Sequence, residues 1–288
     1  AVLLAAFAAV TERIELGTGV VLAPFHDPIR MAEDFAVLDQ ISGGRTLPGF
    51  GIAWREEEFR AFNIDTKTRV GRMVELIEIL RLAWSEGRFD YSGRYFNYEQ
   101  VAVTPTPFRP PPIYVGGFAD EAVRRAGRIG DGYMSSRVPP DRAAQLFELA
   151  TQGWTEAGKK GSPKIAILQN AFVTDDPERD WPMVRDGVGH QLGTYAGWLD
   201  TDVPGVEMKV KPPPEEKLRE LTAFGTPDQV IEYLGPLLQA LSRYPDTHLV
   251  LRQHYPGMDA APAARSIELL GREVAPRLRE AAGQGAHV

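Results

Sequence analysis

Two adjacent glycines, Gly116 and Gly117, separate a short apolar segment from a segment with helical periodicity. The apolar segment is Ile113 to Val115, and the helical pattern runs from about Asp120 to Ile129. A helix that begins directly after a glycine turn presents unpaired backbone N–H groups at the positive end of its dipole, which suits a phosphate. A tight strand-to-helix turn without a ligand has the same signature. The glycine pair is therefore a candidate anion site whose meaning depends on its surroundings.

Several polar side chains follow apolar segments and are candidates for a pocket. Arg252 and His254 stand at the end of the last apolar segment, Thr247 to Gln253, and His26 follows an earlier one. Barrel enzymes gather their active sites at the carboxyl ends of their strands, so either Arg252 or His254 could face inward. A histidine satisfied by the backbone is the alternative.

A third histidine, His190, lies in a segment that we expect to be an irregular helix, Trp181 to Trp198. His190 and Trp198 are eight residues apart and could share a helical face over a pocket, with Tyr195 close to it. Core packing explains this spacing equally well.

The acidic run at 56–58 and the absence of cysteine argue against a metal site and against cysteine chemistry. The run Glu56 to Glu58 has no accompanying histidine or second carboxylate cluster, so we interpret it as a solvated helical turn and predict no metal site. The sequence contains no cysteine, which excludes a thiolate nucleophile and a disulfide framework.

The net charge and the hydropathy of the chain limit the classes of partner that it can bind. The 288 residues carry a net charge of −7 with a pI near 5.4, and no concentrated basic face is visible, so nucleic acid is disfavoured and a small-molecule substrate is expected. No apolar run is long enough to span a membrane. The first ten residues, AVLLAAFAAV, lack a basic flank, so we predict a buried helix there rather than a targeting segment.

The elements that must position these residues alternate between strand and helix. Apolar segments predict strands at 14–22, 45–53, 113–115, 133–135, 164–173 and 247–253. Helices are expected between them, including 28–41, 69–84, 140–158, 227–241 and 264–281, and the aromatic segment 89–103 predicts a hairpin. Repeated strand–helix units with apolar strands indicate an α/β fold with a parallel sheet.

Four segments in this order resemble the bacterial luciferase-like family of flavin- and F420-dependent oxidoreductases. They are TERIELGTGV, LDQISGGRTLPGFGIAWREEEF, PPPIYVGGFADEAVRRAGRIGDGY and HLVLRQHYPG. The resemblance implies one (β/α)₈ TIM barrel domain over residues 1–288, with the hairpin as an insertion at about 88–110. It also implies a chain that begins late: the first strand resembles the family's third, so about 50 residues of barrel would precede Ala1. Catalytic residues are then expected upstream and are not assigned here.

Cofactor-binding residues follow from the same resemblance. Gly19 and Val20 match a pair joined by a cis peptide behind the flavin ring, and Ala53 and Trp54 match a strand end that approaches the cofactor. Gly116, Gly117, Phe118 and Ala119 match the phosphate turn. Many relatives have serine where Ala119 stands, which leaves only backbone donors at that position.

Arg69 matches a phosphate-pairing arginine, a role suited to a forked guanidinium. An exposed arginine at a helix start is the alternative. Asp131, between two glycines, is expected to bond to the backbone in a turn.

The resemblance leaves two activities and an inactive alternative open. In the first, FMN reduced by a separate flavin reductase reacts with O₂ and oxygenates a small organic substrate in a dry pocket. In the second, the deazaflavin F420 exchanges hydride with a substrate. In the third, the barrel binds flavin without catalysis or binds nothing. We also expect a cytoplasmic homodimer that pairs through the helix at 28–41 and its neighbours.

Overall fold

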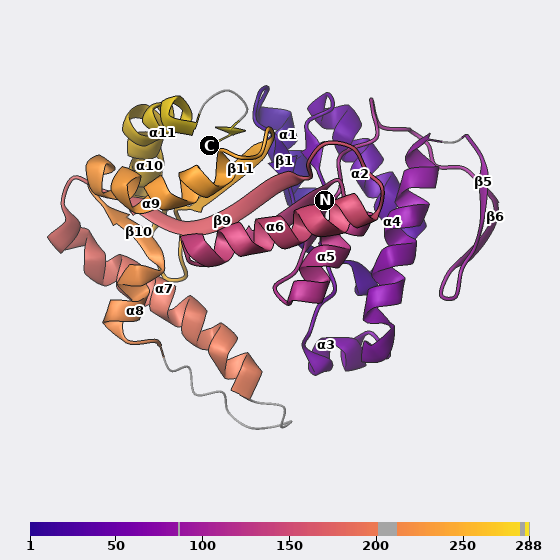
Figure 1. The fold of residues 1–288 in the computed structure, drawn as a ribbon, viewed down its shortest axis with the longest axis horizontal. Helices are drawn as coiled ribbons and strands as arrows, with labels where there is room; N and C mark the ends of the chain where they lie inside the picture. The colour runs from indigo at the N-terminus through magenta and orange to yellow at the C-terminus, as the bar shows by residue number, and fades with distance from the viewer. Residues whose placement is uncertain (86, 201–211, 283–285, 288) are drawn as a thin grey trace. The chain divides into compact units, whose positions relative to one another are not determined.

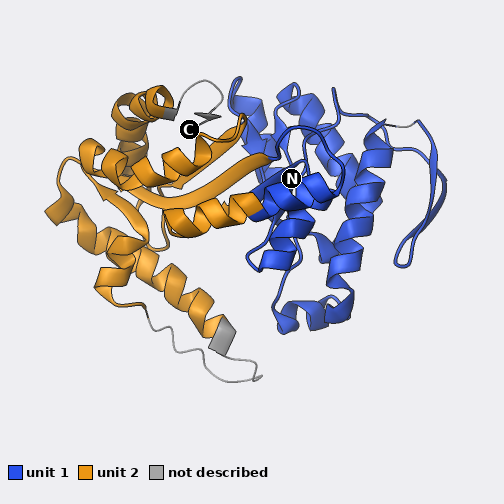
Figure 2. Ribbon diagram, viewed as in Figure 1, with its two compact units in different colours: residues 1–134, 149–163 blue, residues 135–148, 164–288 orange. Residues whose placement is uncertain are grey.

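The computed structural model describes residues 1–85, 87–200, 212–282 and 286–287. The chain divides into two compact units, which Figure 2 colours separately. Unit 1 comprises Ala1–Met134 and Leu149–Pro163, and unit 2 comprises Ser135–Glu148 and Lys164–Val288. The expectation of a single domain stays a prediction.

Unit 1 contains short parallel strands connected by helices (Figure 1). Its strands are β1 (Leu16–Gly17), β2 (Val21–Leu22), β3 (Thr46–Leu47), β4 (Gly49–Gly51) and β7 (Tyr114–Gly116), and β8 (Gly132–Ser136) continues into unit 2. Its helices are α1 (Val2–Val10), α2 (Pro28–Ser42), α3 (Glu56–Ala61), α4 (Arg69–Ser85) and α5 (Asp120–Ile129), followed by the second half of α6 (Pro140–Glu156). In the sheet β4 lies between β2 and β7, and β7 lies between β4 and β8, all in parallel.

Local sequence signals account for the start and end of α2. The Asp27 carboxylate accepts hydrogen bonds from the N–H groups of Ile29 and Arg30, and Pro28 occupies the first turn, where its missing N–H costs nothing. Gly43 ends the helix in the left-handed conformation, with φ of 69°. The helix predicted at 28–41 is confirmed.

The hairpin is also confirmed: β5 (Phe89–Ser92) pairs antiparallel with β6 (Asn97–Val101). Glu75 of α4 holds its turn, because its carboxylate accepts hydrogen bonds from the N–H groups of Arg94, Tyr95 and Phe96. The run Glu56 to Glu58 forms the first turn of α3, as expected. Among the described residues no cluster of histidine, aspartate or glutamate has the geometry of a metal site.

The prediction that the first helix is buried is wrong. Helix α1 forms, but only Ala8 is buried, whereas the exposed fractions of Val2 and Val10 are 89% and 79%. The guanidinium of Arg45 anchors its carboxyl end by donating to the carbonyl oxygens of Ala8 and Thr11. A helix that is apolar on every side carries no signal for how much of its surface finds a partner.

Two predicted strands are each divided in two. The strand expected at 14–22 forms as β1 and β2, and the strand expected at 45–53 forms as β3 and β4, interrupted at Pro48. Proline has no N–H to donate, so it interrupts a strand ladder. The break after β1 has a different origin, described below with the site.

Unit 2 is built around the long strand β9 (Lys164–Val173). In register with β9 run β10 (Thr222–Gly225) and β11 (Thr247–Arg252), and β12 (Ala286–His287) pairs with β11, all in parallel. The helices are the first half of α6, α7 (Pro177–Asp200), α8 (Glu215–Glu220), α9 (Pro227–Leu241), α10 (Ala260–Leu269) and α11 (Ala275–Ala282). Strand β10 was not predicted, and a π-helical turn, Leu270–Val274, separates the last two helices, where a single helix at 264–281 was expected.

Thr226 forms the N-cap of α9, within a reciprocal capping box with Gln229. The core of this unit gathers aromatic and aliphatic side chains between strands and helices. Phe172 of β9, Trp181 and Val184 of α7, Leu218 of α8 and Tyr255 belong to one buried cluster.

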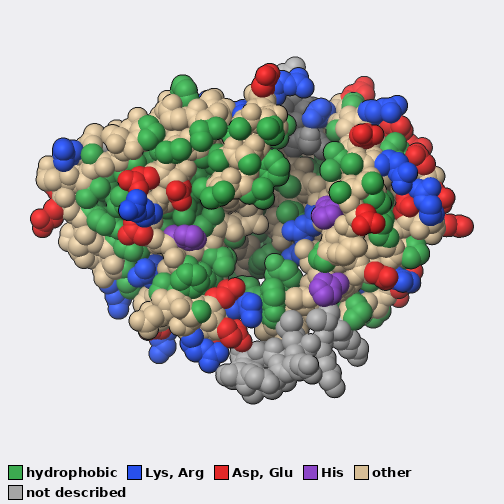
Figure 3. Space-filling model, turned by 180° about the vertical axis from the view of Figure 1, so that it is seen from behind, with side chains coloured by type: hydrophobic (Ala, Val, Ile, Leu, Met, Phe, Trp, Pro, Cys, Tyr) green, Lys and Arg blue, Asp and Glu red, His purple; other side chains and the backbone are tan. Residues whose placement is uncertain are grey.

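On the face shown in Figure 3, acidic and basic side chains are interspersed. Within the described residues, the longer helices are too polar to cross a bilayer.

Candidate functional site

The interruption between β1 and β2 is bridged by one side chain. The Thr18 hydroxyl donates to the carbonyl oxygen of Gly49 at 2.9 Å and accepts from the N–H of the same residue at 2.8 Å. It thereby replaces the backbone ladder where β1 no longer pairs with β3 and β2 does not yet pair with β4. The peptide that follows, between Gly19 and Val20, is cis, which confirms the backbone feature that the resemblance implies at this pair.

Glycines on neighbouring strands fix the position of Val20. A Cβ added to Gly51 of β4 would stand 2.7 Å from Val20 Cγ2, and one added to Gly116 of β7 would stand 3.2 Å from Val20 Cγ1. A side chain at Gly51 would collide with Val20, and one at Gly116 would contact it more tightly than ordinary packing allows. The valine therefore packs directly on the backbone of two adjacent strands, which allows a close approach at this end of the sheet.

Two exposed aromatic residues follow these strands. Trp54 comes after β4, with 43% of its surface exposed, and Phe118 comes after β7, with 58% exposed. Parallel strands end at the same edge of a sheet, so both residues lie at that edge. Between β4 and Trp54, the buried Ala53 adopts a left-handed backbone with φ of 57°, which is unusual for a residue other than glycine.

The turn at residues 116–119 leads into α5 without a side-chain cap. Ala119 is the N-cap residue, and its side chain has no oxygen that could accept from the first-turn N–H groups. The Tyr133 hydroxyl donates to the carbonyl oxygen of Gly117 at 2.8 Å and so holds the turn against β8. A Cβ on Gly117 would stand 3.0 Å from Ala122 Cβ, so this glycine permits the tight connection.

Arg69 begins α4, which runs alongside α5 (Figure 1). At the far ends of both helices, Arg81 donates to the carbonyl oxygen of Ile129 and pairs with Asp131. Arg69 lies 12 residues before Arg81 and the start of α5 lies 9 residues before Ile129, so at about 1.5 Å per residue the two helix starts are at similar levels. Asp131 also accepts from the N–H of Ile113, in the turn role expected of it.

The surroundings of Arg69 are electropositive. One terminal nitrogen donates to the carbonyl oxygen of Thr66, but the buried Nε has no hydrogen-bond partner among the described residues. Burial lowers the pKa of Arg125 on α5, and the charges of Arg128 and Arg69 lower it further against the opposing effect of Glu121. Glu121 itself pairs with Arg128. An uncapped helix start beside an arginine with an unused donor fits a phosphate group.

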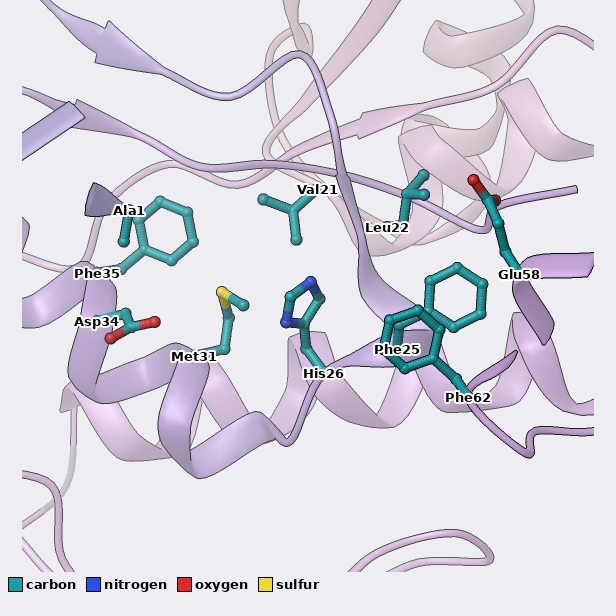
Figure 4. Close-up of a pocket in the computed structure, with 10 residues that line it drawn as sticks. All are labelled: Ala1, Val21, Leu22, Phe25, His26, Met31, Asp34, Phe35, Glu58 and Phe62. Carbon is teal, nitrogen blue, oxygen red and sulfur yellow. The ribbon is translucent and has the colours of Figure 1, made fainter. Parts of the chain in front are cut away.

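His26 lies elsewhere in unit 1. It lines a cavity of about 350 Å³ together with Met31 and Asp34 of α2 and with Phe25 and Phe62, and its ring points into the cavity (Figure 4). Burial lowers the pKa of His26, partly opposed by Asp34. None of the predicted cofactor residues lines this cavity.

The other pocket candidates lie in unit 2. The ring Nε2 of His254 is 3.0 Å from the carbonyl oxygen of Met258, which is the backbone contact considered as its alternative. His190 is exposed on α7. Tyr195 of the same helix stacks edge-on against Trp198, with ring centroids 5.1 Å apart. Arg252 ends β11, and its Nη1 is buried without a hydrogen-bond partner in the described chain.

Sequence reasoning missed four residues that the structure makes prominent: Thr18, Arg125, Arg137 and Asn170. The clearest signal for one of them was the polar pair Gln169-Asn170 inside the otherwise apolar segment 164–173, because a polar side chain in a buried strand needs a partner. Thr18 stood between two glycines and gave no sign of its bridging role.

Comparison with known proteins gives a consistent result. The family model described as luciferase-like monooxygenase matches residues 1–241. An F420-dependent glucose-6-phosphate dehydrogenase of Nocardia farcinica is 28% identical over 285 residues, which cover 96% of this chain and 82% of that protein.

Two solved structures extend the comparison. The monooxygenase RslO1 of Streptomyces bottropensis is 25% identical with a TM-score of 0.83, covering 96% of this chain and 82% of that one. The oxygenating component of 3,6-diketocamphane monooxygenase of Pseudomonas putida, in complex with FMN, is 23% identical with a TM-score of 0.75 and covers 96% of this chain and 83% of that one. The fold class is the luciferase-like α/β barrel type, as expected.

Proposed function

The chain belongs to the luciferase-like monooxygenase family, and on this premise we propose that it binds a phosphate-bearing flavin or deazaflavin through the turn at residues 116–119. It is an oxidoreductase of this family. The observation that carries the binding proposal is the uncapped start of α5 beside the unused, buried Nε of Arg69.

The roles of the chain's own residues follow from their positions. The first-turn N–H groups of α5 donate to the phosphate, and the guanidinium of Arg69 adds a charged donor. The backbone at Gly19 and Val20 supports the ring system. The hydrogen bonds between Thr18 and Gly49 hold this backbone in position. Trp54 and Phe118 provide apolar surface at the same edge of the sheet, where they exclude water. When bound, the cofactor supplies the redox chemistry.

The first candidate activity is FMN-dependent monooxygenation of a small organic substrate. It is supported by the similarity to a monooxygenase over 96% of the chain with a TM-score of 0.83. A separate flavin reductase would supply the reduced cofactor, and the apolar side chains of Trp54 and Phe118 would keep water from the reacting groups.

The second candidate is F420-dependent hydride transfer. It is supported by the 28% identity to an F420-dependent dehydrogenase over 96% of the chain. Both cofactors carry a phosphate, so the same turn serves either one.

Titration with cofactors tests the binding proposal and separates the two candidates. The purified chain is titrated with FMN, with riboflavin, which lacks the phosphate, and with F420, and binding is followed by fluorescence. We expect FMN or F420 to bind saturably and FMN to bind at least tenfold more tightly than riboflavin. Equal affinity for FMN and riboflavin, with no binding of F420, would show that the turn does not hold a phosphate.

Matched variants locate the binding site. Arg69→Leu removes the guanidinium from the proposed site, whereas Arg60→Leu removes one from the exposed surface of α3. We expect the first variant to lose at least tenfold in affinity for the preferred cofactor, about 1.4 kcal/mol, and the second to bind normally. If Arg69→Leu binds the cofactor with unchanged affinity, the assignment of Arg69 to the phosphate site is wrong.

Pairing as a homodimer through α2 and a cytoplasmic location stay predictions. Light scattering of the purified chain measures the first, and Val37→Glu on the exposed face of α2 would convert a dimer that uses this surface into monomers.

A further inference from the structure

Three neighbouring strands of unit 2 place polar side chains side by side. Asn170 in β9 is in register with Thr222 of β10 on one side and with Arg252 of β11 on the other. Residues in register on adjacent parallel strands project from the same face of a sheet. Asn170 is fully buried and Thr222 is 2% exposed, so this row lies in the interior of the unit.

The polar atoms of this row have no hydrogen-bond partner among the described residues. Both amide atoms of Asn170, Oγ1 of Thr222 and Nη1 of Arg252 are buried, and none has a hydrogen bond within the described part of the chain. Buried polar atoms are nearly always paired, because burial removes their hydrogen bonds to water. Four such atoms on three adjacent strands indicate a site whose ligand supplies the missing bonds.

A second arginine approaches the same group. Arg137 follows β8 with a left-handed backbone, φ of 51°, and its N–H donates to the carbonyl oxygen of Leu168, two residues before Asn170. Its Nη1 is also buried and has no hydrogen-bond partner among the described residues, and its guanidinium lies 5.2 Å from the centre of the Tyr195 ring. A strained backbone that orients a charged side chain is typical of binding sites.

No carboxylate of the described residues forms an ion pair with either arginine, Arg137 or Arg252. Burial lowers the pKa of Arg137, and the positive charge of Arg252 lowers it further. Two guanidinium groups that each bury an Nη1 nitrogen repel one another unless an anion joins them.

Tyr255 fixes the geometry on one side of this group. Its hydroxyl lies 2.8 Å from the carbonyl oxygen of Arg252 and 3.0 Å from that of Ala171, and only 1% of the residue is exposed. The backbone that carries Arg252 is thus held to β9 by a buried hydrogen bond, and Asn170 is fixed within the middle of the same strand.

We propose that unit 2 contains an oxyanion-binding site formed by Arg137, Arg252, Asn170 and Thr222, and that it holds a phosphate or carboxylate group of the substrate. The guanidinium groups bind the charge, and the amide and hydroxyl donate to the remaining oxygens. The identification of the ligand as the substrate rests on the proposed function; the site itself does not. The substrate class is then a small organic molecule with a compact anionic end.

The test measures binding of two simple anions. Because inorganic phosphate could also bind at the start of α5, the starting protein is the full chain with Arg69→Leu. It is titrated calorimetrically with inorganic phosphate and with acetate at constant ionic strength. We expect saturable binding of at least one anion, and the preferred one indicates whether the substrate carries a phosphate or a carboxylate.

Second substitutions assign the binding to this group. Arg252→Gln or Arg137→Gln added to the starting protein should weaken the preferred anion at least tenfold, Arg252→Lys should retain part of the affinity, and the exposed Arg243→Gln should have no effect. Circular dichroism confirms that each protein is folded. Absence of saturable binding of either anion to the starting protein, or unchanged binding after both glutamine substitutions, would overturn the proposal.

The cofactor titration keeps the two proposals separable. The unsubstituted chain is titrated with FMN and F420 as above, independently of the anion measurements. Cofactor binding without anion binding refutes only the oxyanion site, and anion binding without cofactor binding refutes only the proposed function.

Discussion

Replacing Thr18 by valine tests whether one hydroxyl holds the divided strand together. Valine keeps the branched shape but removes the group that both donates to and accepts from the backbone of Gly49. The N–H and the carbonyl oxygen of Gly49 would lose this partner. An unsatisfied buried polar group costs about 1–3 kcal/mol, and because this site is only partly buried we take about 1–2 kcal/mol for each group.

The expected loss in the free energy of unfolding is therefore about 2–4 kcal/mol. For a chain of this length, at about 2 °C for each kcal/mol, Tm should fall by about 4–8 °C. The assay is thermal and guanidinium unfolding followed by circular dichroism. Under the proposed function, the affinity for the cofactor should also fall several-fold, because the backbone at Gly19 and Val20 loses its support.

Thr18→Ser is the matched control, because it keeps the hydroxyl and removes only a methyl group. It should retain most of the stability that the valine variant loses. If Thr18→Val unfolds at the temperature of the unsubstituted chain, water replaces the hydroxyl without cost, and the bridge is not what holds β2 in position.

Three further changes have expected outcomes. Ala119→Ser adds a hydroxyl at the N-cap of α5, which should raise the free energy of unfolding by about 0.5–1 kcal/mol. The same variant should bind the cofactor with higher affinity in the fluorescence titration. Gly51→Ala places a Cβ 2.7 Å from Val20 Cγ2, so unfolding should show a loss of about 1–3 kcal/mol. Hydrogen bonds from Arg179 and Thr174 lower the pKa of Asp180 in the folded chain. The stabilisation that is present above the unfolded pKa of this carboxyl should therefore disappear as the pH falls through the lower folded pKa. Asp180→Asn should reduce the pH dependence of Tm in that pH range.

Controls distinguish these effects from general damage. Gly235→Ala, in the interior of α9 with open space around it, should stabilise the chain slightly where Gly51→Ala destabilises it. Asp186→Asn, on the exposed side of α7, should leave the acid dependence of Tm unchanged. The argument for Gly51 is contradicted if Gly51→Ala is as stable as the unsubstituted chain, and the argument for Ala119 if Ala119→Ser is destabilised. The argument for Asp180 is contradicted if Asp180→Asn leaves the acid dependence of Tm unaltered.

Features that depend on neighbouring residues in the chain were predictable. The start of α2 at Pro28, its end at Gly43, the cap at Thr226 and the turn role of Asp131 all follow from side chains that bond within a few residues. The glycine pair before α5 belongs to the same class. The cis peptide at Gly19 was expected only through the resemblance, because no local pattern encodes it.

The exposure of α1 could not be predicted in this way. Its apolar composition favoured burial, yet burial requires a partner surface that a helix does not specify on its own. The break between β1 and β2 was hidden for a similar reason, since the hydroxyl that bridges it binds a residue 31 positions away.

The sequence by itself determined the alternation of most strands and helices, the caps of α2 and α9 and the glycine turn, because these depend on backbone conformations and hydrogen bonds between near neighbours. Only the tertiary structure decided that Arg137, Asn170, Thr222 and Arg252 meet. They are separated by 33, 52 and 30 residues along the chain, and strand register is what brings three of them into one row. Register depends on pairing between distant segments, and no single segment carries that information.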